Sequence, residues 1–238
     1  MELYIIPTPL GNLEDMTFRA VETLKKVDAV FCEDTRRSLQ LLNHFGIKKK
    51  LFRYNEHDER SLGTAVGWLR SGKTAALVTD GGSPCISDPG FRLVAECRLA
   101  GIKVVPLPGP SAVITAAAGS GLPTDSFIFL GFLPRSKGKM AKALRAAFAF
   151  GKTVILYESP YRIKKFLSFV AAEFGADTQT VIARELTKIY EEFITGTAAD
   201  VLRQLEQGGD VKGEIVVMLR PADKCCDEQQ SDGGYDDI

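Results

Sequence analysis

Short apolar runs alternate with helical stretches along the first half of the chain, and this alternation constrains the fold more than any other feature. We predict five strands and four intervening helices. The strands are Leu3–Ile6, Ala29–Cys32, Leu51–Arg53, Ala75–Val78 and Val104–Leu107, and the helices are Thr17–Val27, Thr35–Phe45, Glu59–Ser71 and Pro89–Ala100. Repeated βα units imply an α/β fold with a mostly parallel, doubly wound sheet covered by helices on both faces.

Glycine, aspartate and proline mark the ends of these helices. Gly46 and Gly101 each follow a helix, where a left-handed C-cap is expected. The pair Asp88-Pro89 predicts the start of the fourth helix, with Asp88 as the N-cap and Pro89 at the first helical position.

The pattern changes after Leu107, where a segment rich in small residues carries one short helix and leads to a second α/β domain. There we predict strands at Phe127–Gly131, Val154–Tyr157, Thr180–Ala183, Glu192–Thr195 and Ile215–Leu219, and helices at Ala141–Phe150, Arg162–Glu173 and Ala198–Gln207. The short spacing from Ala183 to Glu192 indicates a hairpin, so the second sheet should be mixed. We expect domains at residues 1–117 and 118–222 and a disordered acidic tail at residues 223–238.

Composition and charge narrow the class of protein. No apolar run approaches the roughly 20 residues of a membrane span, and no cleavable leader pattern is visible, so we expect a cytoplasmic protein. The five cysteines are scattered and form no C-x-x-C pair, which indicates reduced thiols and no zinc site. Residues 223–238 hold six of the 30 acidic residues and one of the 30 basic ones, so residues 1–222 carry a positive surplus compatible with a polyanionic partner.

Three Pro/Gly-rich turns follow strands of the first sheet, at Pro7–Asn12, Asp80–Pro84 and Leu107–Ser111. Parallel strands end at one edge of a sheet, where open α/β sheets bind ligands, so the turns should form one rim. A single turn is explained equally well as a tight connection, but "DGGSPCISDPG" is longer than a βα connection needs. Prolines supply no N–H, and the G-x-G-x-x-G fingerprint is absent. The expected ligand is therefore nucleoside-like and poor in phosphate.

Charged residues gather at further strand ends, in Glu33–Arg37, "LYESPYR" (156–162) and "ARELTKIYEE" (183–192). The alternative for Asp34 or Thr35 is a helix N-cap, and for the others solvated loop charge. Their convergence on strand ends favours a cleft. Two histidines without ligand-spaced partners argue against a metal site, and Ser111 is not in a G-x-S-x-G elbow, which argues against a serine hydrolase.

Seven segments, taken together, resemble the bacterial ribosomal RNA small-subunit methyltransferase I family of the tetrapyrrole-methylase superfamily. They are "LYIIPTPLGNLEDMTFRAVETLKKVDAVFCEDTRRS", "LVTDGGSPCISDPG", "VVPLPGPSAVITAAAGSGLP", "GFLPR", "YESPYR", "ARELTKIYEE" and "GEIVVML", in the family's order and spacing over essentially residues 1–220. The resemblance implies two α/β domains with the donor S-adenosyl-L-methionine in the cleft between them. It further implies 2′-O-methylation of a cytidine in the decoding region of small-subunit (16S) ribosomal RNA by a homodimer. The partner is then this RNA, either free or within the 30S subunit, and the sequence does not distinguish the two.

The resemblance also assigns residues to the donor. The positions that match the family's donor contacts are Leu10, Gly11, Gly82, Ser83, Ile86, Ser111 and Ala112 in the first domain and Tyr157, Glu158 and Thr187 in the second. This chain reads "DGGSPC" where the family usually reads Asp-Ala-Gly-Thr-Pro-Leu, a change expected to leave the donor pocket intact.

A methyl transfer to a ribose hydroxyl is helped by a base that takes the hydroxyl proton. Asp34 is the first candidate and Glu185 the second, with Arg36, Arg184 and Lys188 expected to hold phosphates or orient the carboxylates. The segment "PRSKGKMAKALR" carries the bases Arg135, Lys137, Lys139, Lys142 and Arg145, and the expected RNA contacts are Arg36, Arg37 and the first four of these. The alternative for this last segment is a solvated helix start.

Three other functions compete with this one. A tetrapyrrole (precorrin-type) methylase would share the fold, but the Glu33–Arg36 segment and the basic "PRSKGK" stretch favour RNA. A non-catalytic RNA-binding assembly factor would have no need to bind the donor. A nicotinamide-dependent dehydrogenase is disfavoured, because both the glycine fingerprint and an acid about 20 residues beyond it are missing.

Overall fold

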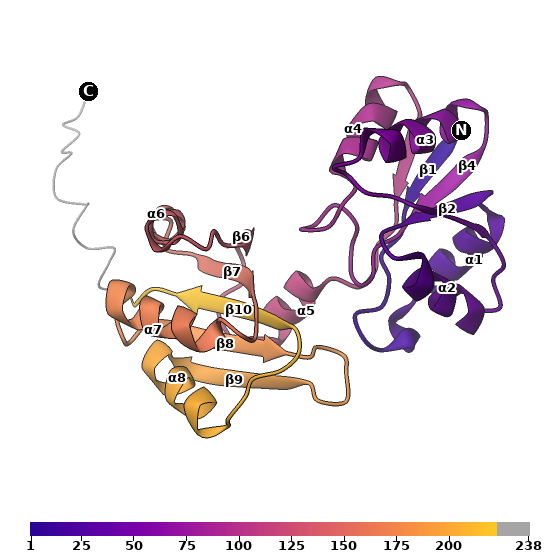
Figure 1. Ribbon diagram of the computed structural model, residues 1–238. Coiled ribbons are helices and arrows are strands. Elements are labelled where there is room, and N and C mark those ends of the chain that lie inside the picture. Colours follow the sequence, from indigo (N-terminus) through magenta and orange to yellow (C-terminus); the bar gives the residue numbers. More distant parts are fainter. Residues whose placement is uncertain (223–238) are drawn as a thin grey trace, which may run out of the picture. The chain divides into compact units, whose positions relative to one another are not determined.

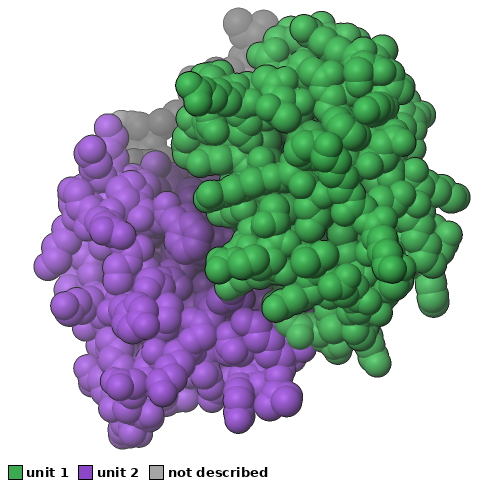
Figure 2. Space-filling model, turned by 45° about the vertical axis from the view of Figure 1, so that its right-hand side comes forward, with its two compact units in different colours: residues 1–112 green, residues 113–238 purple. Residues whose placement is uncertain are grey.

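The computed structural model describes residues 1–222, which fold into two compact units. The units are residues 1–112 and the part of the chain from Val113 onward, and they carry different colours in Figure 2. The division falls at the start of helix α5 (Ala112–Gly119), whereas the boundary expected after residue 117 lies inside that helix. The predicted disordered tail at residues 223–238 lies outside the described residues.

The first unit is built on a five-stranded sheet with the order β3-β2-β4-β1-β5, in which every pair is parallel. Its strands are β1 (Glu2–Ile5), β2 (Ala29–Cys32), β3 (Lys50–Arg53), β4 (Thr74–Leu77) and β5 (Lys103–Pro106). Its helices are α1 (Phe18–Lys26), α2 (Thr35–His44), α3 (Glu59–Arg70) and α4 (Phe91–Leu99), with a short 3₁₀ turn, η1 (Leu13–Asp15). The predicted parallel α/β sheet is confirmed (Figure 1).

Helices cover both faces of this sheet, which makes it doubly wound. On one face Leu24 of α1 and Leu42 of α2 pack with strand residues such as Val30. On the other face Leu69 of α3 and Leu93 of α4 pack with the opposite side chains of the strands. Because both faces are buried, the central strands read as unbroken apolar runs, and β2 is buried at every position.

The helix ends follow the local sequence in most cases. Thr17, Asp34 and Asp58 are side-chain N-caps of α1, α2 and α3, each accepting a backbone N–H bond from the first turn. Gly46 and Gly101 have φ angles of 65° and 68°, so both predicted left-handed C-caps are confirmed.

The predicted start of the fourth helix is wrong. Helix α4 begins at Phe91 after an N-cap at Gly90, whose φ is 145°, and not at Asp88 and Pro89. The reason is a buried carboxylate from elsewhere in the chain, because Glu56 accepts the Gly90 N–H. That bond satisfies one of the free amides at the helix start, so no Asp cap is required there.

The second unit contains a five-stranded sheet with the order β6-β7-β10-β8-β9. Its elements are β6 (Phe127–Phe132), α6 (Lys137–Phe148), β7 (Thr153–Glu158), α7 (Ile163–Phe174), β8 (Gln179–Arg184), β9 (Glu192–Thr197), α8 (Ala198–Gln207) and β10 (Ile215–Arg220). Strands β6 and β7 are parallel, and the other pairs are antiparallel. The predicted mixed sheet and the β8–β9 hairpin are confirmed.

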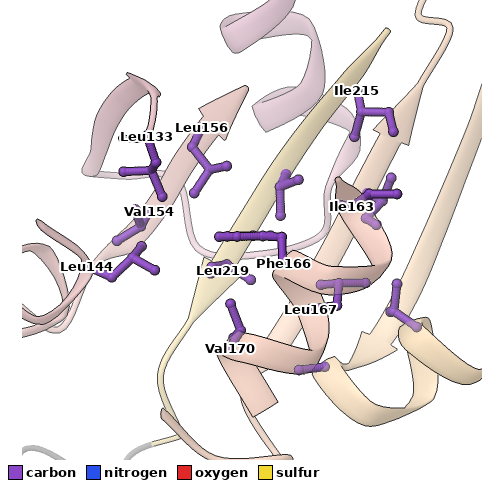
Figure 3. Packing of buried hydrophobic residues seen from close by; sticks show 14 of the residues in the cluster. Leu133, Leu144, Val154, Leu156, Ile163, Phe166, Leu167, Val170, Ile215 and Leu219 are labelled. Atoms are coloured by element: carbon purple, nitrogen blue, oxygen red, sulfur yellow. The ribbon is translucent and has the colours of Figure 1, made fainter. Parts of the chain in front are cut away.

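Helices α6, α7 and α8 pack on one face of the second sheet around a single apolar core. Figure 3 shows Phe166, Leu167 and Val170 on the side of α7 that faces the strands, near Leu219 of β10. On the other face, Gly119 of α5 lies against the ring of Phe193, where an added Cβ would come within 2.6 Å of Cζ. Glycine is therefore required for this close approach of α5 to β9.

The largest boundary error in the second unit is at α6, which was predicted to begin at Ala141 and begins at Lys137. Met140 and Leu144 lie one turn apart and both enter the core, which extends the helical period toward the N-terminus. As a result Lys137 and Lys139 lie on the helix itself, together with Lys142, and not on a connection before it.

Candidate functional site

The first two Pro/Gly-rich turns are joined by backbone hydrogen bonds. The N–H of Thr8 donates to the Gly82 carbonyl over 2.9 Å, and the N–H of Gly82 donates to the Thr8 carbonyl over 2.8 Å. The buried hydroxyl of Thr8 also donates to the Thr79 carbonyl at 3.0 Å. These bonds fix the turn after β1 against the turn after β4.

The third turn is attached to the other two by side-chain and packing contacts. The Ser83 hydroxyl donates to the Pro110 carbonyl at 3.0 Å, directly before Ser111. Gly109 lies so close to the ring of Pro7 that an added Cβ would come within 2.8 Å of Pro7 Cβ. The three turns thus form one continuous rim at the carboxyl edge of the first sheet, as the sequence indicated.

The rim brings together several of the residues expected to contact the donor. An added Cβ at Gly82 would lie 3.4 Å from Leu10 Cδ2, and Ser83 is bonded to the residue before Ser111. Ile86 belongs to the same loop as Ser83 and exposes 44% of its surface. Gly11 and Ala112 follow directly in the first and third turns.

Three cavities adjoin one another along the same edge. Their volumes are about 350, 420 and 560 Å³, and all are lined by residues of the first unit. The 350 Å³ cavity lies between the first turn and α2, and Asp80 lines both it and the 420 Å³ cavity. Glu33 and Arg53 line both the 420 Å³ and the 560 Å³ cavities. Asp80 and Arg53 were not proposed as site residues from the sequence, although Arg53 ends β3 and Asp80 opens the turn after β4.

Asp34 caps helix α2 and is also paired with an arginine. Its Oδ1 accepts the Arg36 backbone N–H at 2.8 Å, and Oδ2 accepts from Arg36 Nη2 at 2.8 Å. The Arg36 guanidinium holds the pKa of the Asp34 carboxyl well below its usual range. The N-cap alternative is therefore confirmed. The role of Asp34 as a base stays a prediction. Because Arg36 stabilises the ionised form of the carboxylate, Asp34 is a weak base in this state.

The neighbouring charges line the same cavities. Arg37 forms an ion pair with Asp80 at 3.3 Å, which joins α2 to the loop after β4. Glu33 lines two of the cavities, and its side chain forms no ion pair within residues 1–222. Arg36 and Arg37 are both exposed, Arg36 to 88% of its side chain.

In the second unit the end of β7 carries a buried acid. The carboxylate of Glu158 is 2% exposed and pairs with Arg162 at 2.7 Å, and it also accepts the Ser159 N–H at 2.6 Å. Tyr157 packs against the rings of Phe129 and Phe132 at centroid distances of 5.2 and 5.3 Å. The side chains of Glu158 and Tyr157 therefore both have structural partners. The Glu158–Arg162 pair could have been predicted from the sequence, because an acid and a base stand four residues apart.

The connection between β8 and β9 is held in a strained conformation around Glu185. Glu185 and Thr187 have φ angles of 52° and 65°, which non-glycine residues seldom adopt. The Glu185 carboxylate accepts from Lys188 Nζ at 2.8 Å and from the Glu214 N–H at 3.0 Å. Lys188, followed by the Glu214 amide, lowers the Glu185 pKa. Such strain is characteristic of functional loops.

The remaining predicted bases take several positions. Arg184 pairs with Glu192 across the hairpin at 2.8 Å. Arg135 is exposed just before α6, and Lys137, Lys139 and Lys142 are exposed on that helix without an ion pair in the described part of the chain. Arg145, one turn further, pairs with Glu173 of α7.

No helix within residues 1–222 is both long enough and apolar enough to cross a membrane. The same residues contain no group of three or more His, Cys, Asp or Glu side chains that could hold a metal ion. Cys32, Cys85 and Cys97 are free thiols, and the other two cysteines lie outside the described residues.

The chemistry of the rim fits a methyl donor of the S-adenosylmethionine type. Pro7, Pro9, Pro84 and Pro110 have no N–H groups, so the rim offers fewer donors to a phosphate, which favours a cationic ligand. Gly81 allows the second turn to approach the first closely, since a Cβ at this position would come within 3.3 Å of the Pro9 carbonyl oxygen.

Comparison with known proteins also indicates a methyltransferase. The family model "Tetrapyrrole (Corrin/Porphyrin) Methylases" matches residues 2–202. The protein named Ribosomal RNA small subunit methyltransferase I from Bacillus subtilis is 45% identical over 91% of this chain and 74% of its own length. The protein of the same name from Hydrogenobaculum is 45% identical over 92% of this chain and 95% of its own length.

Solved structures with the same fold are more distant in sequence. A diphthine synthase superposes with a TM-score of 0.72 at 16% identity, covering 92% of this chain and 90% of its own. A cobalt precorrin-4 methyltransferase superposes with a TM-score of 0.66 at 21% identity, covering 91% of this chain and 94% of its own. The sequence relatives and the family model together show that the chain belongs to the ribosomal RNA small subunit methyltransferase I family of the tetrapyrrole methylases.

Proposed function

We propose that the protein transfers a methyl group from S-adenosylmethionine to the 2′-hydroxyl of a cytidine in the decoding region of small-subunit ribosomal RNA. Its family makes it an S-adenosylmethionine-dependent methyltransferase. The observation that carries the proposal is the bonded rim, in which Thr8 and Gly82 exchange two backbone hydrogen bonds and Ser83 reaches Pro110.

The donor residues proposed from the family resemblance are consistent with this rim. Leu10, Gly11, Gly82, Ser83, Ile86, Ser111 and Ala112 of the first unit, and Tyr157, Glu158 and Thr187 of the second, would hold S-adenosylmethionine. Because the Glu158 carboxylate is buried in its pair with Arg162, Glu158 would contact the donor through its backbone. When bound, the donor supplies a methyl group on a sulfonium centre that is already activated for transfer.

The chain's own residues then have to orient the ribose and accept the hydroxyl proton. Arg36 and Arg37 are exposed beside the cavities and suit contacts to phosphate. Asp34 remains our first candidate base, because it lines the 420 Å³ cavity, and Glu185 the second. Both are already paired with cations, so each would accept a proton only after its cation turned toward an RNA phosphate.

The family resemblance names small-subunit ribosomal RNA or the 30S subunit that contains it as the partner, and of the two we propose the subunit as the substrate. A homodimer is proposed on the same basis, and light scattering should then give twice the chain mass of 26.0 kDa. The bases Arg135, Lys137, Lys139 and Lys142 would bind the RNA backbone.

A methyl-transfer assay with three acceptors tests the proposal. The protein is incubated with S-adenosylmethionine labelled in the methyl group and with 30S subunits from a strain that lacks the modification, with deproteinised small-subunit RNA, or with a tetrapyrrole. Incorporation into the RNA of the subunit is expected. Incorporation into the tetrapyrrole alone would support the precorrin-type alternative, and donor binding without any transfer would contradict the enzymatic proposal.

A further inference from the structure

A group of lysines lies at the amino ends of the strands, on the sheet edge opposite the rim. Lys48 and Lys49 precede β3, Lys50 begins it, and Lys73 precedes β4. The register places Ala29 of β2 opposite both Lys50 of β3 and Ala75 of β4, so these strand starts are adjacent. We call Lys48, Lys49, Lys50 and Lys73 the amino-edge lysines.

The amino-edge lysines are not neutralised by acids. Within residues 1–222 none of the four forms an ion pair, whereas Lys25, Lys103 and Lys152 each pair with a carboxylate. The acid beside them is Asp28, whose carboxylate accepts the Thr74 N–H at 2.7 Å and the Thr74 hydroxyl at 2.8 Å. These bonds, followed by the attraction of Lys49 and Lys73, lower the Asp28 pKa. Asp28 therefore attracts two of the four ammonium groups, those of Lys49 and Lys73, and forms an ion pair with neither.

An aromatic pair holds two of these ammonium groups in place. The Trp68 indole N–H donates to the Thr74 carbonyl at 3.3 Å, and its ring meets the edge of Phe52 at 5.1 Å. Lys73 Nζ lies 4.1 Å from the Trp68 ring centroid, and Lys50 Nζ lies 4.7 Å from that of Phe52. A cation–π contact fixes an ammonium group without cancelling its charge, so the group can still bind an anion.

The lysines are connected to the candidate site by an exposed edge strand. Strand β3 is at the end of the sheet order, with Lys50 exposed at its start and Arg53 exposed at its end. Arg53 lines the 420 and 560 Å³ cavities. Three residue steps along a strand span about 10 Å, and alternation places the Lys50 and Arg53 side chains on opposite faces of β3, so a path between them crosses the outer edge of this strand.

We propose that the amino-edge lysines bind the phosphate backbone of the RNA substrate, which leaves the carboxyl-edge cavities past Arg53 and follows strand β3. The inference rests on the proposed function for the identity of the polyanion. The competing explanation is that lysine on an edge strand prevents pairing with other chains. That explanation covers Lys50 only, because Lys48, Lys49 and Lys73 lie outside the strand.

Salt dependence of RNA binding tests the inference. The variant K48Q/K49Q/K73Q removes three charges outside the strands, and K25Q/K103Q/K152Q removes three charges that are already paired. Affinity for deproteinised small-subunit RNA is measured over a range of KCl concentrations. Each lost phosphate contact lowers the slope of log affinity against log salt by roughly 0.7 to 0.9. The first variant should lose a slope of about 2, and the control should retain the wild-type slope.

Equal slopes for the two variants would overturn the inference. An unchanged RNA slope with lost binding to phosphatidylglycerol vesicles would overturn it in favour of a lipid surface. Methylation by the wild-type protein is measured in parallel. If the wild type methylates RNA and the slopes agree, the inference alone fails. If the slope falls and no RNA is methylated, the RNA surface stands and the proposed function fails.

Discussion

Thr8 and Gly82 exchange two backbone hydrogen bonds, of 2.9 and 2.8 Å, across a gap of more than 70 residues in the chain. Gly82 has a φ of 92°, and its missing side chain leaves Leu10 Cδ2 in van der Waals reach of the position where a Cβ would stand. The pair thus joins two turns that are each expected to contact the methyl donor. A substitution at Gly82 can therefore test the donor site, if its effect on the fold is measured separately.

Gly82→Ala should weaken S-adenosylmethionine binding at least fivefold by calorimetry, because the new Cβ meets Leu10 and the positive φ is strained. The matched control is Gly72→Ala, since Gly72 has a φ of 90° with open space around it. Both variants should lose about 1 kcal/mol or more of stability from backbone strain. Equal donor affinities in the two variants would remove Gly82 and Leu10 from the donor site.

Ser111→Phe should abolish donor binding while leaving the melting temperature within a few degrees of wild type. Ser111 is only partly buried, and it follows the Pro110 carbonyl that accepts the Ser83 hydroxyl. Unchanged affinity for S-adenosylmethionine would contradict the assignment of the third turn to the donor.

Asp34→Asn should leave the melting temperature and donor affinity nearly unchanged and reduce single-turnover methylation at least tenfold. Asparagine keeps the oxygen that caps α2 but loses the charge, and general bases contribute on the order of 10² to 10⁴ in rate. Asp58→Asn is the control, because Asp58 caps α3 in the same way through the Arg60 N–H. Wild-type turnover in Asp34→Asn would transfer the role to Glu185 or to a mechanism without a protein base.

Much of this site was predictable because its signals are local. Apolar runs and Pro/Gly turns fixed the strands and the rim, and Asp34 was recognisable as a cap from its place before α2. The start of α4 was not predictable, because Glu56, far back in the chain, bonds the Gly90 amide and replaces the Asp88 cap. The partners of Lys188 and Arg37 were equally hidden, since Glu214 and Asp80 meet them only in the folded chain.

Stability should depend on pH through Glu185. Its pKa is lowered in the folded state by Lys188 and the Glu214 amide, so its contribution is complete above the unfolded value near 4.5 and is lost as pH falls through the folded value. The difference in free energy of unfolding between wild type and Glu185→Gln should therefore shrink from pH 6 to pH 3 in urea titrations.

The lysines of α6 should contribute to RNA affinity without affecting the donor. The variant K137Q/K139Q/K142Q removes three exposed charges without ion pairs and should weaken RNA binding and flatten its salt dependence. Arg145→Gln on the same helix removes a charge already paired with Glu173 and should change the slope less than any one of the three lysines. An unchanged slope in the triple variant would leave these lysines as a solvated helix face.

The central claim concerns the atom that receives the methyl group, and nucleoside chemistry tests it directly. Methyl-labelled RNA from the 30S reaction is digested once with alkali and once with a nuclease that releases single nucleotides. A 2′-O-methyl group blocks alkaline cleavage at its own nucleotide, so the account predicts that the label appears in one alkali-resistant dinucleotide beginning with cytidine. Label in an alkali-sensitive mononucleotide would place the methyl group on a base and would contradict the account.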